Sequence, residues 1–155
     1  MPPSREIVLD DISPCRGRLL VAEDNAALRD YLVGVLRAEG YEVAEASTAD
    51  DLLNTLTMSL HTDLGSAEFD LVIAEDRLVG PGAPVPGNSG TRASVPPFVL
   101  IGTDSRRRSA ATLLGTNAVD MFDKPLDMDS LRDAVHRIAN NVVDSRQATN
   151  AQERN

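Results

Sequence analysis

The sequence feature that most constrains the fold is an apolar run that ends in two adjacent carboxylates. Residues 69–80 read FDLVIAEDRLVG. The apolar part of this run shows no alternation, which is typical of a strand covered on both faces, as in a parallel sheet packed between helices. Glu75 and Asp76 then follow at the carboxyl end of the strand. Because open α/β sheets carry their binding sites at that end, we expect an acidic pocket there.

A second short strand ends in the same way. Residues 18–22, RLLVA, are followed directly by Glu23 and Asp24. If both strands are parallel members of one sheet, up to four carboxylates gather at one edge, where mutual repulsion raises their pKa values unless a cation intervenes. Hard oxygen ligands favour Mg²⁺ or Ca²⁺. The alternative is that Asp24 and Asn25 only cap the helix that follows, a common role for these residue types.

Strands alternate with helices along the rest of the chain. The patterns predict further strands over about residues 41–46, 98–101 and 118–122, and helices over about 26–39 and 105–115. A helix capped by Ser47 or Thr48 is expected to reach about residue 60, and a last helix, capped by Asp127 or Asp129, is expected to reach about residue 142. The density of Pro and Gly in residues 81–97 forbids a stable helix there. The third helix of the series is therefore expected to be degenerate or missing. Such an alternation predicts an α/β fold with a five-stranded parallel sheet.

Length and charge narrow the possible functions. The 155 residues, 42% hydrophobic, fit one compact domain. We place this domain at residues 18–143, with a flexible arm or linker at 1–17 and a disordered tail at 144–155. The net charge of −9 argues against binding to nucleic acid or to an anionic membrane. The single cysteine excludes an internal disulfide, and no apolar span or signal peptide is recognisable, so we expect a cytoplasmic protein.

Three motifs together resemble the receiver domain of bacterial two-component response regulators. They are VAEDN at residues 21–25, DLVIAEDRLVG at 70–80 and DKPL at 123–126. The resemblance covers about residues 18–143 and implies a flavodoxin-like, doubly wound sheet with strand order 2-1-3-4-5. It also implies a role in phosphorelay signal transduction. The chain is then not an enzyme, beyond accepting a phosphoryl group and dephosphorylating itself.

The resemblance implies a magnesium site at the acidic edge. In the family, the acidic pair after the first strand holds Mg²⁺ together with the phosphoacceptor, which corresponds here to Glu23, Asp24 and Glu75. The residue two positions after the phosphoacceptor usually offers its backbone carbonyl to the metal, and that residue is Arg77. A metal ion at this place neutralises charge on a transferring phosphoryl group.

The resemblance also implies which residues contact the phosphoryl group. Lys124 matches the lysine of the fifth strand that contacts its oxygens. The hydroxyl residue expected after the fourth strand aligns with Gly102, or with Thr103 if the register slips by one. The phosphoacceptor column holds Glu75 where family members carry an aspartate.

These departures favour an atypical, pseudo-receiver-like module that binds proteins, with Glu75 in the phosphoacceptor position. Val79 replaces a proline and Met121 an aromatic residue, which puts parts of the usual switch in doubt. The alternative is a working phosphoacceptor that uses Asp76 or Glu75 itself with Mg²⁺. Adjacent strand residues face opposite ways, so Asp76 could serve only at a bulge or at the start of the loop.

The partner surface implied by the resemblance comprises the fourth helix, the fifth strand and the last helix. Its partner would be a histidine kinase, a phosphotransfer protein or an attached output domain. Arg106, Arg107 and Arg108 lie at the start of this surface, although a basic trio of this kind is usually only a solvated face. A metal-dependent phosphatase or a flavin-binding enzyme would share the architecture. Neither the nucleophile-plus-acid motif nor the phosphate-cradling loop that these enzymes need is recognisable.

Overall fold

The computed structural model describes residues 16–61, 69–79, 96–102 and 118–153. These residues form five strands, three α-helices and one short 3-10 turn. The strands are β1 Arg18–Ala22, β2 Glu42–Ala46, β3 Leu71–Glu75, β4 Phe98–Gly102 and β5 Ala118–Asp123. The helices are α2 Ala26–Ala38, α3 Ala49–His61 and α5 Met128–Glu153, and a short 3-10 turn, η1 Asp76–Leu78, follows β3.

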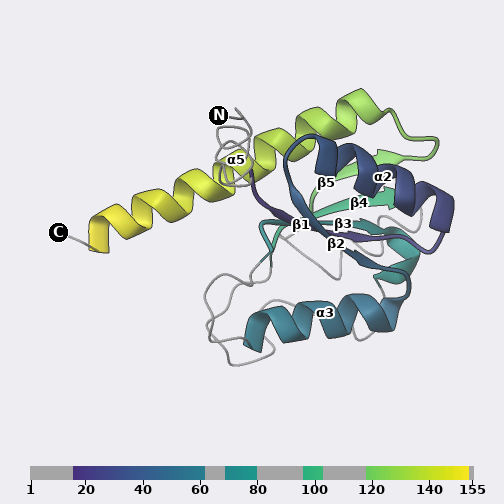
Figure 1. Ribbon diagram of the computed structural model, residues 1–155, viewed down its shortest axis with the longest axis horizontal. Coiled ribbons are helices and arrows are strands. Elements are labelled where there is room, and N and C mark those ends of the chain that lie inside the picture. The colour runs from purple at the N-terminus through teal and green to yellow at the C-terminus, as the bar shows by residue number, and fades with distance from the viewer. Residues whose placement is uncertain (1–15, 62–68, 80–95, 103–117, 154–155) are drawn as a thin grey trace, which may run out of the picture.

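The strands form one parallel sheet in the order β2-β1-β3-β4-β5. This arrangement confirms the predicted flavodoxin-like fold class. Helices α2 and α5 lie over one face of the sheet and α3 lies over the other, as Figure 1 shows. The more polar strand, β2, lies at an edge, whereas β3 is in the middle and is buried along its whole length.

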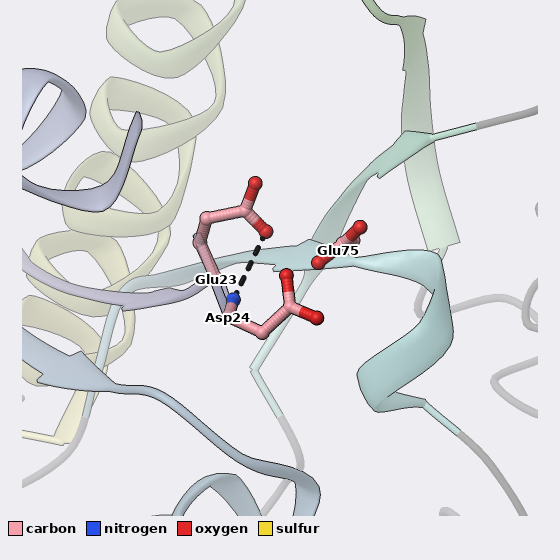
Figure 2. Close-up of side chains that lie close together, drawn as sticks. All are labelled: Glu23, Asp24 and Glu75. Carbon is pink, nitrogen blue, oxygen red and sulfur yellow. Dashed lines mark hydrogen bonds between the residues drawn. The ribbon is translucent and has the colours of Figure 1, made fainter. Parts of the chain in front are cut away.

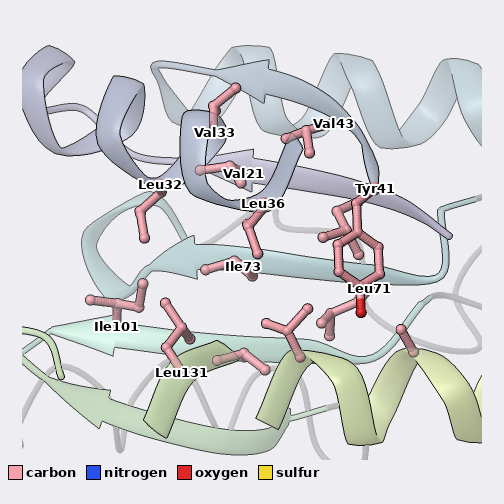
Figure 3. Packing of buried hydrophobic residues seen from close by; sticks show 14 residues of the cluster. Val21, Leu32, Val33, Leu36, Tyr41, Val43, Leu71, Ile73, Ile101 and Leu131 are labelled. Atoms are coloured by element: carbon pink, nitrogen blue, oxygen red, sulfur yellow. The ribbon is translucent and has the colours of Figure 1, made fainter. Parts of the chain in front are cut away.

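Alternate residues of β3 belong to two separate cores. Leu71 and Ile73 pack with α2 and α5, in the cluster drawn in Figure 3. Val72 and Ala74 pack in the second cluster, on the side of α3. Because both faces of the strand are covered, the lack of alternation in its sequence has a direct structural cause.

Two polar residues near the carboxyl edge of the sheet, Asn25 and Thr48, cap the helices that follow them. The Asn25 side chain caps α2, with its Oδ1 accepting a hydrogen bond of 3.0 Å from the backbone N–H of Leu28. Thr48 caps α3 in the same way, through a bond of 3.0 Å from the N–H of Asp51 to its Oγ1. Since Asn25 takes the capping role, Asp24 is not needed for it.

The last helix is longer than the sequence patterns indicate. Residues 144–153 belong to α5, whereas their polar composition favours a disordered tail. In Figure 1 this part of α5 extends beyond the sheet. It contains neither Gly nor Pro, and a helix that is already anchored by packing can lengthen without a new nucleation step.

Several expectations concern residues outside the described ranges. They include most of the arm at 1–17, nearly all of the Pro- and Gly-rich segment 81–97, and the helix at 105–115. Among the helices that the structure describes, none combines the length and the apolar character needed to cross a bilayer.

Candidate functional site

The pairing of β1 with β3 brings the predicted acids together. Ala22 is the register partner of Ala74, so the residues that follow them, Glu23 and Glu75, lie side by side at the carboxyl edge of the sheet. Carboxylate oxygens of Glu23, Asp24 and Glu75 all lie within 4.8 Å of one another. Figure 2 shows these three side chains, with the backbone N–H of Asp24 donating to Glu23 Oε2 at 3.1 Å. We call this group the acidic cluster.

The fourth acid, Asp76, packs against the end of β4. It is the first residue of η1 and is only 4% exposed. A Cβ atom placed on Gly102 would collide with the Asp76 carboxylate, so the missing side chain of the glycine makes room for this acid. Glu75 and Asp76 therefore diverge where the strand becomes a turn.

Lys124, directly after β5, contacts the acidic cluster. Gly102 pairs with Asp123, the last residue of β5, and this pairing brings Lys124, which follows directly, to the same edge of the sheet. The Lys124 ammonium donates to Glu23 Oε1 at 2.6 Å and to Glu75 Oε1 at 3.0 Å. The predicted juxtaposition of this lysine with the acids is therefore present.

The side chain of Arg77 is a member of the site that the sequence patterns do not indicate. Its Nε and Nη2 donate to Glu75 Oε1 at 2.9 and 2.7 Å. The same Nη2 lies 3.1 Å from Asp24 Oδ1 and 3.0 Å from Asp24 Oδ2. The resemblance implies a role only for the backbone carbonyl of this residue. The sequence feature that could have indicated the Arg77 side chain is charge balance, because several acids at one sheet edge favour a nearby cation.

Burial and these contacts shift the pKa values of the three carboxyl groups in different directions. Burial, together with the neighbouring Glu75, raises the pKa of Glu23 to about 7, although Lys124 opposes this. Burial raises the pKa of Glu75 too, but its hydrogen bonds with Glu23, Asp24, Arg77 and Lys124 outweigh this and hold the pKa well below the usual range. The hydrogen bond with Glu75 and burial raise the pKa of Asp24. Glu75 is thus ionised, and Glu23 carries the proton when the cluster holds one.

The stability of the protein should therefore fall as pH rises from about 5 to 7.5. The folded state keeps the Glu23 proton up to about pH 7, whereas the unfolded chain loses it near the ordinary value of 4.5. Between these values the folded state binds more protons, so the free energy of unfolding decreases with pH, by about 1–3 kcal/mol from this group. Urea denaturation at a series of pH values, with chelator present, measures the change.

Glu23→Gln is the variant that isolates this effect. Its amide does not titrate, so the variant should lose the part of the slope that Glu23 supplies, while slopes from other groups remain. Parallel stability profiles for wild type and Glu23→Gln would show that Glu23 does not hold the proton.

The acidic cluster has the donor chemistry of a divalent-cation site. All three members offer carboxylate oxygens, the ligand type that Mg²⁺ prefers. One oxygen, Oε2 of the buried Glu75, has no hydrogen-bond donor within the described part of the chain. A buried acceptor without a donor is costly, and a cation at this place would relieve that cost. The residues present thus fit a hard metal ion.

Other residues named from the sequence are placed less completely. Thr103 and the basic trio at 106–108 lie outside the described residues. Met121, where an aromatic residue was expected from the resemblance, is 45% exposed on β5. Val79 is buried just after η1.

Comparison with known proteins identifies the fold. No family model matches the chain, and no curated protein matches it in sequence. Solved structures match with probability 1.00. NtrX from Brucella abortus is 23% identical with a TM-score of 0.59, over 86% of this chain and 29% of NtrX. FixJ from B. japonicum is 23% identical with a TM-score of 0.62, over 86% of this chain and 63% of FixJ. The receiver domain of the hybrid histidine kinase CckA is 25% identical with a TM-score of 0.50, over 79% of this chain and 99% of that domain.

The chain thus spans less than two thirds of FixJ and less than a third of NtrX, and nearly the whole of the CckA receiver domain. The resemblance to response-regulator receiver domains is confirmed by these structures, and the fold is that of a receiver domain.

Proposed function

We propose that the chain is a phosphorelay receiver module in which Glu75 holds the partner-competent state without a phosphodonor. The observation that supports this most directly is the contact of 3.0 Å between the Lys124 ammonium and the Glu75 carboxylate. In the resembling family this lysine contacts the oxygens of the phosphoryl group. A permanent carboxylate on residue 75 meets the same cation, and its depressed pKa keeps it charged.

The length of glutamate is what brings its charge to the lysine. One extra methylene moves the carboxylate about 1.5 Å further from the backbone than in aspartate. The imitation of a phosphoryl group is incomplete, because a carboxylate has one charge and two oxygens, where a phosphoryl group has nearly two charges and three oxygens. Arg77 adds a second cation to Glu75 Oε1, so this one carboxylate oxygen holds both cations.

The packing of Asp76 supports Glu75 over Asp76 as the functional residue. Asp76 stands at the start of a turn, the one place where an acid next to Glu75 could reach the same pocket. Its carboxylate is instead buried against Gly102. Moving it toward Lys124 would empty that space and expose the end of β4.

Mg²⁺ is the metal that this site would take, held by the carboxylates of Glu23, Asp24 and Glu75 and, as the resemblance implies, by the Arg77 carbonyl. When bound, it would supply positive charge beside a transferring phosphoryl group. The chain's own residues set the geometry, because Lys124 fixes Glu23 and Glu75 through one ammonium group. In this proposal the module is not an enzyme, and the wild type does not accept a phosphoryl group.

The partner surface in this proposal includes β5 and the start of α5. Val119 and Met121 on β5 are 46% and 45% exposed, which gives this strand apolar surface for a partner. The partner would be a histidine kinase, a phosphotransfer protein or an attached output domain, in a cytoplasmic setting. Lys124 follows β5 directly, so the state of the acidic cluster can be transmitted to this surface.

Hydrogen exchange tests whether this state exists without phosphorylation. With Mg²⁺ present throughout, a small-molecule phosphodonor should leave amide exchange across residues 118–140 of the wild type unchanged. Glu75→Ala removes one of the two carboxylates that hold Lys124, so exchange around Lys124 should become faster. A phosphodonor-dependent change in the wild type, or no difference between wild type and Glu75→Ala, would contradict the proposal.

A further inference from the structure

Among the described residues, two cations of the protein, Arg77 and Lys124, lie in contact with the acidic cluster. Lys124 joins Glu23 to Glu75, and the Arg77 guanidinium joins Glu75 to Asp24. Three nitrogens, Arg77 Nε, Arg77 Nη2 and Lys124 Nζ, converge on the single oxygen Glu75 Oε1 at 2.7 to 3.0 Å. The two cations balance most of the charge of three carboxylates, so the cluster is held together by the chain's own residues.

We propose that Arg77 is an internal counter-ion that competes with divalent cations for Asp24 and Glu75. A cation coordinated by these carboxylates at about 2 Å would come close to the guanidinium that shares their oxygens. Two positive groups in such proximity repel each other, and the carboxylate oxygens cannot serve both fully. Binding of the cation therefore requires Arg77 to move away.

The Arg77 side chain is exposed enough to move away from the carboxylates. The Arg77 side chain is 47% exposed, whereas that of Lys124 is 30% exposed. Arg77 belongs to the short turn η1, at the surface end of the sheet, and its guanidinium can swing into solvent without opening the core. Because the two equilibria are linked, cation binding releases Arg77 to the surface, and the Arg77 contacts weaken cation binding to the same extent.

Calorimetric titration of Mg²⁺ into the full chain tests this competition without any phosphodonor. It uses the proposed function only to choose the ion, so its outcome is independent of whether Glu75 imitates a phosphoryl group. Arg77→Gln should bind Mg²⁺ about 10- to 100-fold more tightly than the wild type, because charge-assisted hydrogen bonds no longer have to be broken. Mg²⁺ should also raise the melting temperature of Arg77→Gln more than that of the wild type.

Three further variants make the result specific. Arg137→Gln removes the same charge from an exposed ion pair with Asp120, so its Mg²⁺ affinity should stay within about twofold of the wild type. Arg77→Lys keeps the charge but loses the planar fork, and should fall between wild type and Arg77→Gln. Asp24→Asn in the Arg77→Gln background should weaken binding again. The proposal would be overturned if folded Arg77→Gln bound Mg²⁺ no more tightly than the wild type. It would equally be overturned if neither protein bound Mg²⁺.

Discussion

Gly102→Ala is expected to lower the free energy of unfolding by about 2–6 kcal/mol. Two costs combine in this estimate: about 1–3 kcal/mol for overpacking and about 1–3 kcal/mol for a strained backbone. The first arises because the new Cβ collides with the buried Asp76 carboxylate. The second arises because Gly102 has a φ of +154°, which residues with a side chain rarely adopt. Urea denaturation of wild type and variant measures the sum.

A double-mutant cycle separates the two costs. Asp76→Ala removes the colliding carboxylate, so the alanine at position 102 should be less harmful in that background than in the wild type, leaving mainly the backbone cost. Gly34→Ala is the matched control. Gly34 is an exposed residue of α2, and apart from its chain neighbours and the backbone of its own helix, no atom of the described residues lies within 4 Å of a new Cβ. Its replacement should stabilise the protein by about 0.5–1 kcal/mol. Strictly additive effects of Gly102→Ala and Asp76→Ala would show that the two residues do not share this space.

The contact between Asp76 and Gly102 has a functional consequence as well. The resembling family carries a hydroxyl side chain at or next to this position. In this chain the corresponding space at residue 102 is filled by an acid from the neighbouring strand end. A side chain at residue 102 would therefore occupy the space that the buried Asp76 carboxylate fills.

Glu75→Asp is expected to convert an unreactive protein into one that is phosphorylated by a small-molecule phosphodonor with Mg²⁺. In-line transfer depends on the placement of the attacking oxygen, and a misplacement of about 1 Å can cost on the order of a hundredfold in rate. Shortening the side chain by one methylene withdraws the carboxylate by about 1.5 Å and opens space beside Lys124 for the phosphoryl group. Intact mass should then increase by one phosphoryl group, located at position 75 by peptide mapping.

Two controls accompany this experiment. Glu75→Gln has nearly the size of the wild-type side chain but no nucleophilic carboxylate, and should gain no mass. Lys124→Met in the Glu75→Asp background removes the cation that would stabilise the transferring group, and should slow the reaction strongly. A folded Glu75→Asp protein that gains no phosphoryl group would contradict the idea that side-chain length alone prevents the reaction.

The sequence allowed the fold and much of the acidic cluster to be predicted because both depend on local patterns. Two apolar runs that end in acids must be buried strands, and parallel strands carry their ends to one edge. This logic placed Glu23, Asp24 and Glu75 together, and the DKPL motif placed Lys124 beside them. The capping role that the sequence left open between Asp24 and Asn25 is taken by Asn25, which accepts from the N–H of Leu28. The carboxylate of Asp24 instead contacts Arg77.

The remaining features depend on geometry that has no local pattern. The direction of the Arg77 side chain follows from the 3-10 turn η1, which is too short to have a periodicity. The contact of Asp76 with Gly102 joins residues of neighbouring strand ends that are far apart in sequence. The extension of α5 to Glu153 depends on the packing of its first half, where Leu131 and Val135 are buried, rather than on the composition of its polar end.

If Glu75 replaces phosphorylation, the intact mass of the wild-type protein should not change on exposure to a phosphodonor. The chain is incubated with a small-molecule phosphodonor and Mg²⁺, and its mass is recorded beside that of Glu75→Asp under the same conditions. We expect no gain of mass in the wild type and a gain of one phosphoryl group in the variant. Stoichiometric phosphorylation of the wild type, mapped to Asp76 or to Glu75, would contradict this expectation and would show a working phosphoacceptor.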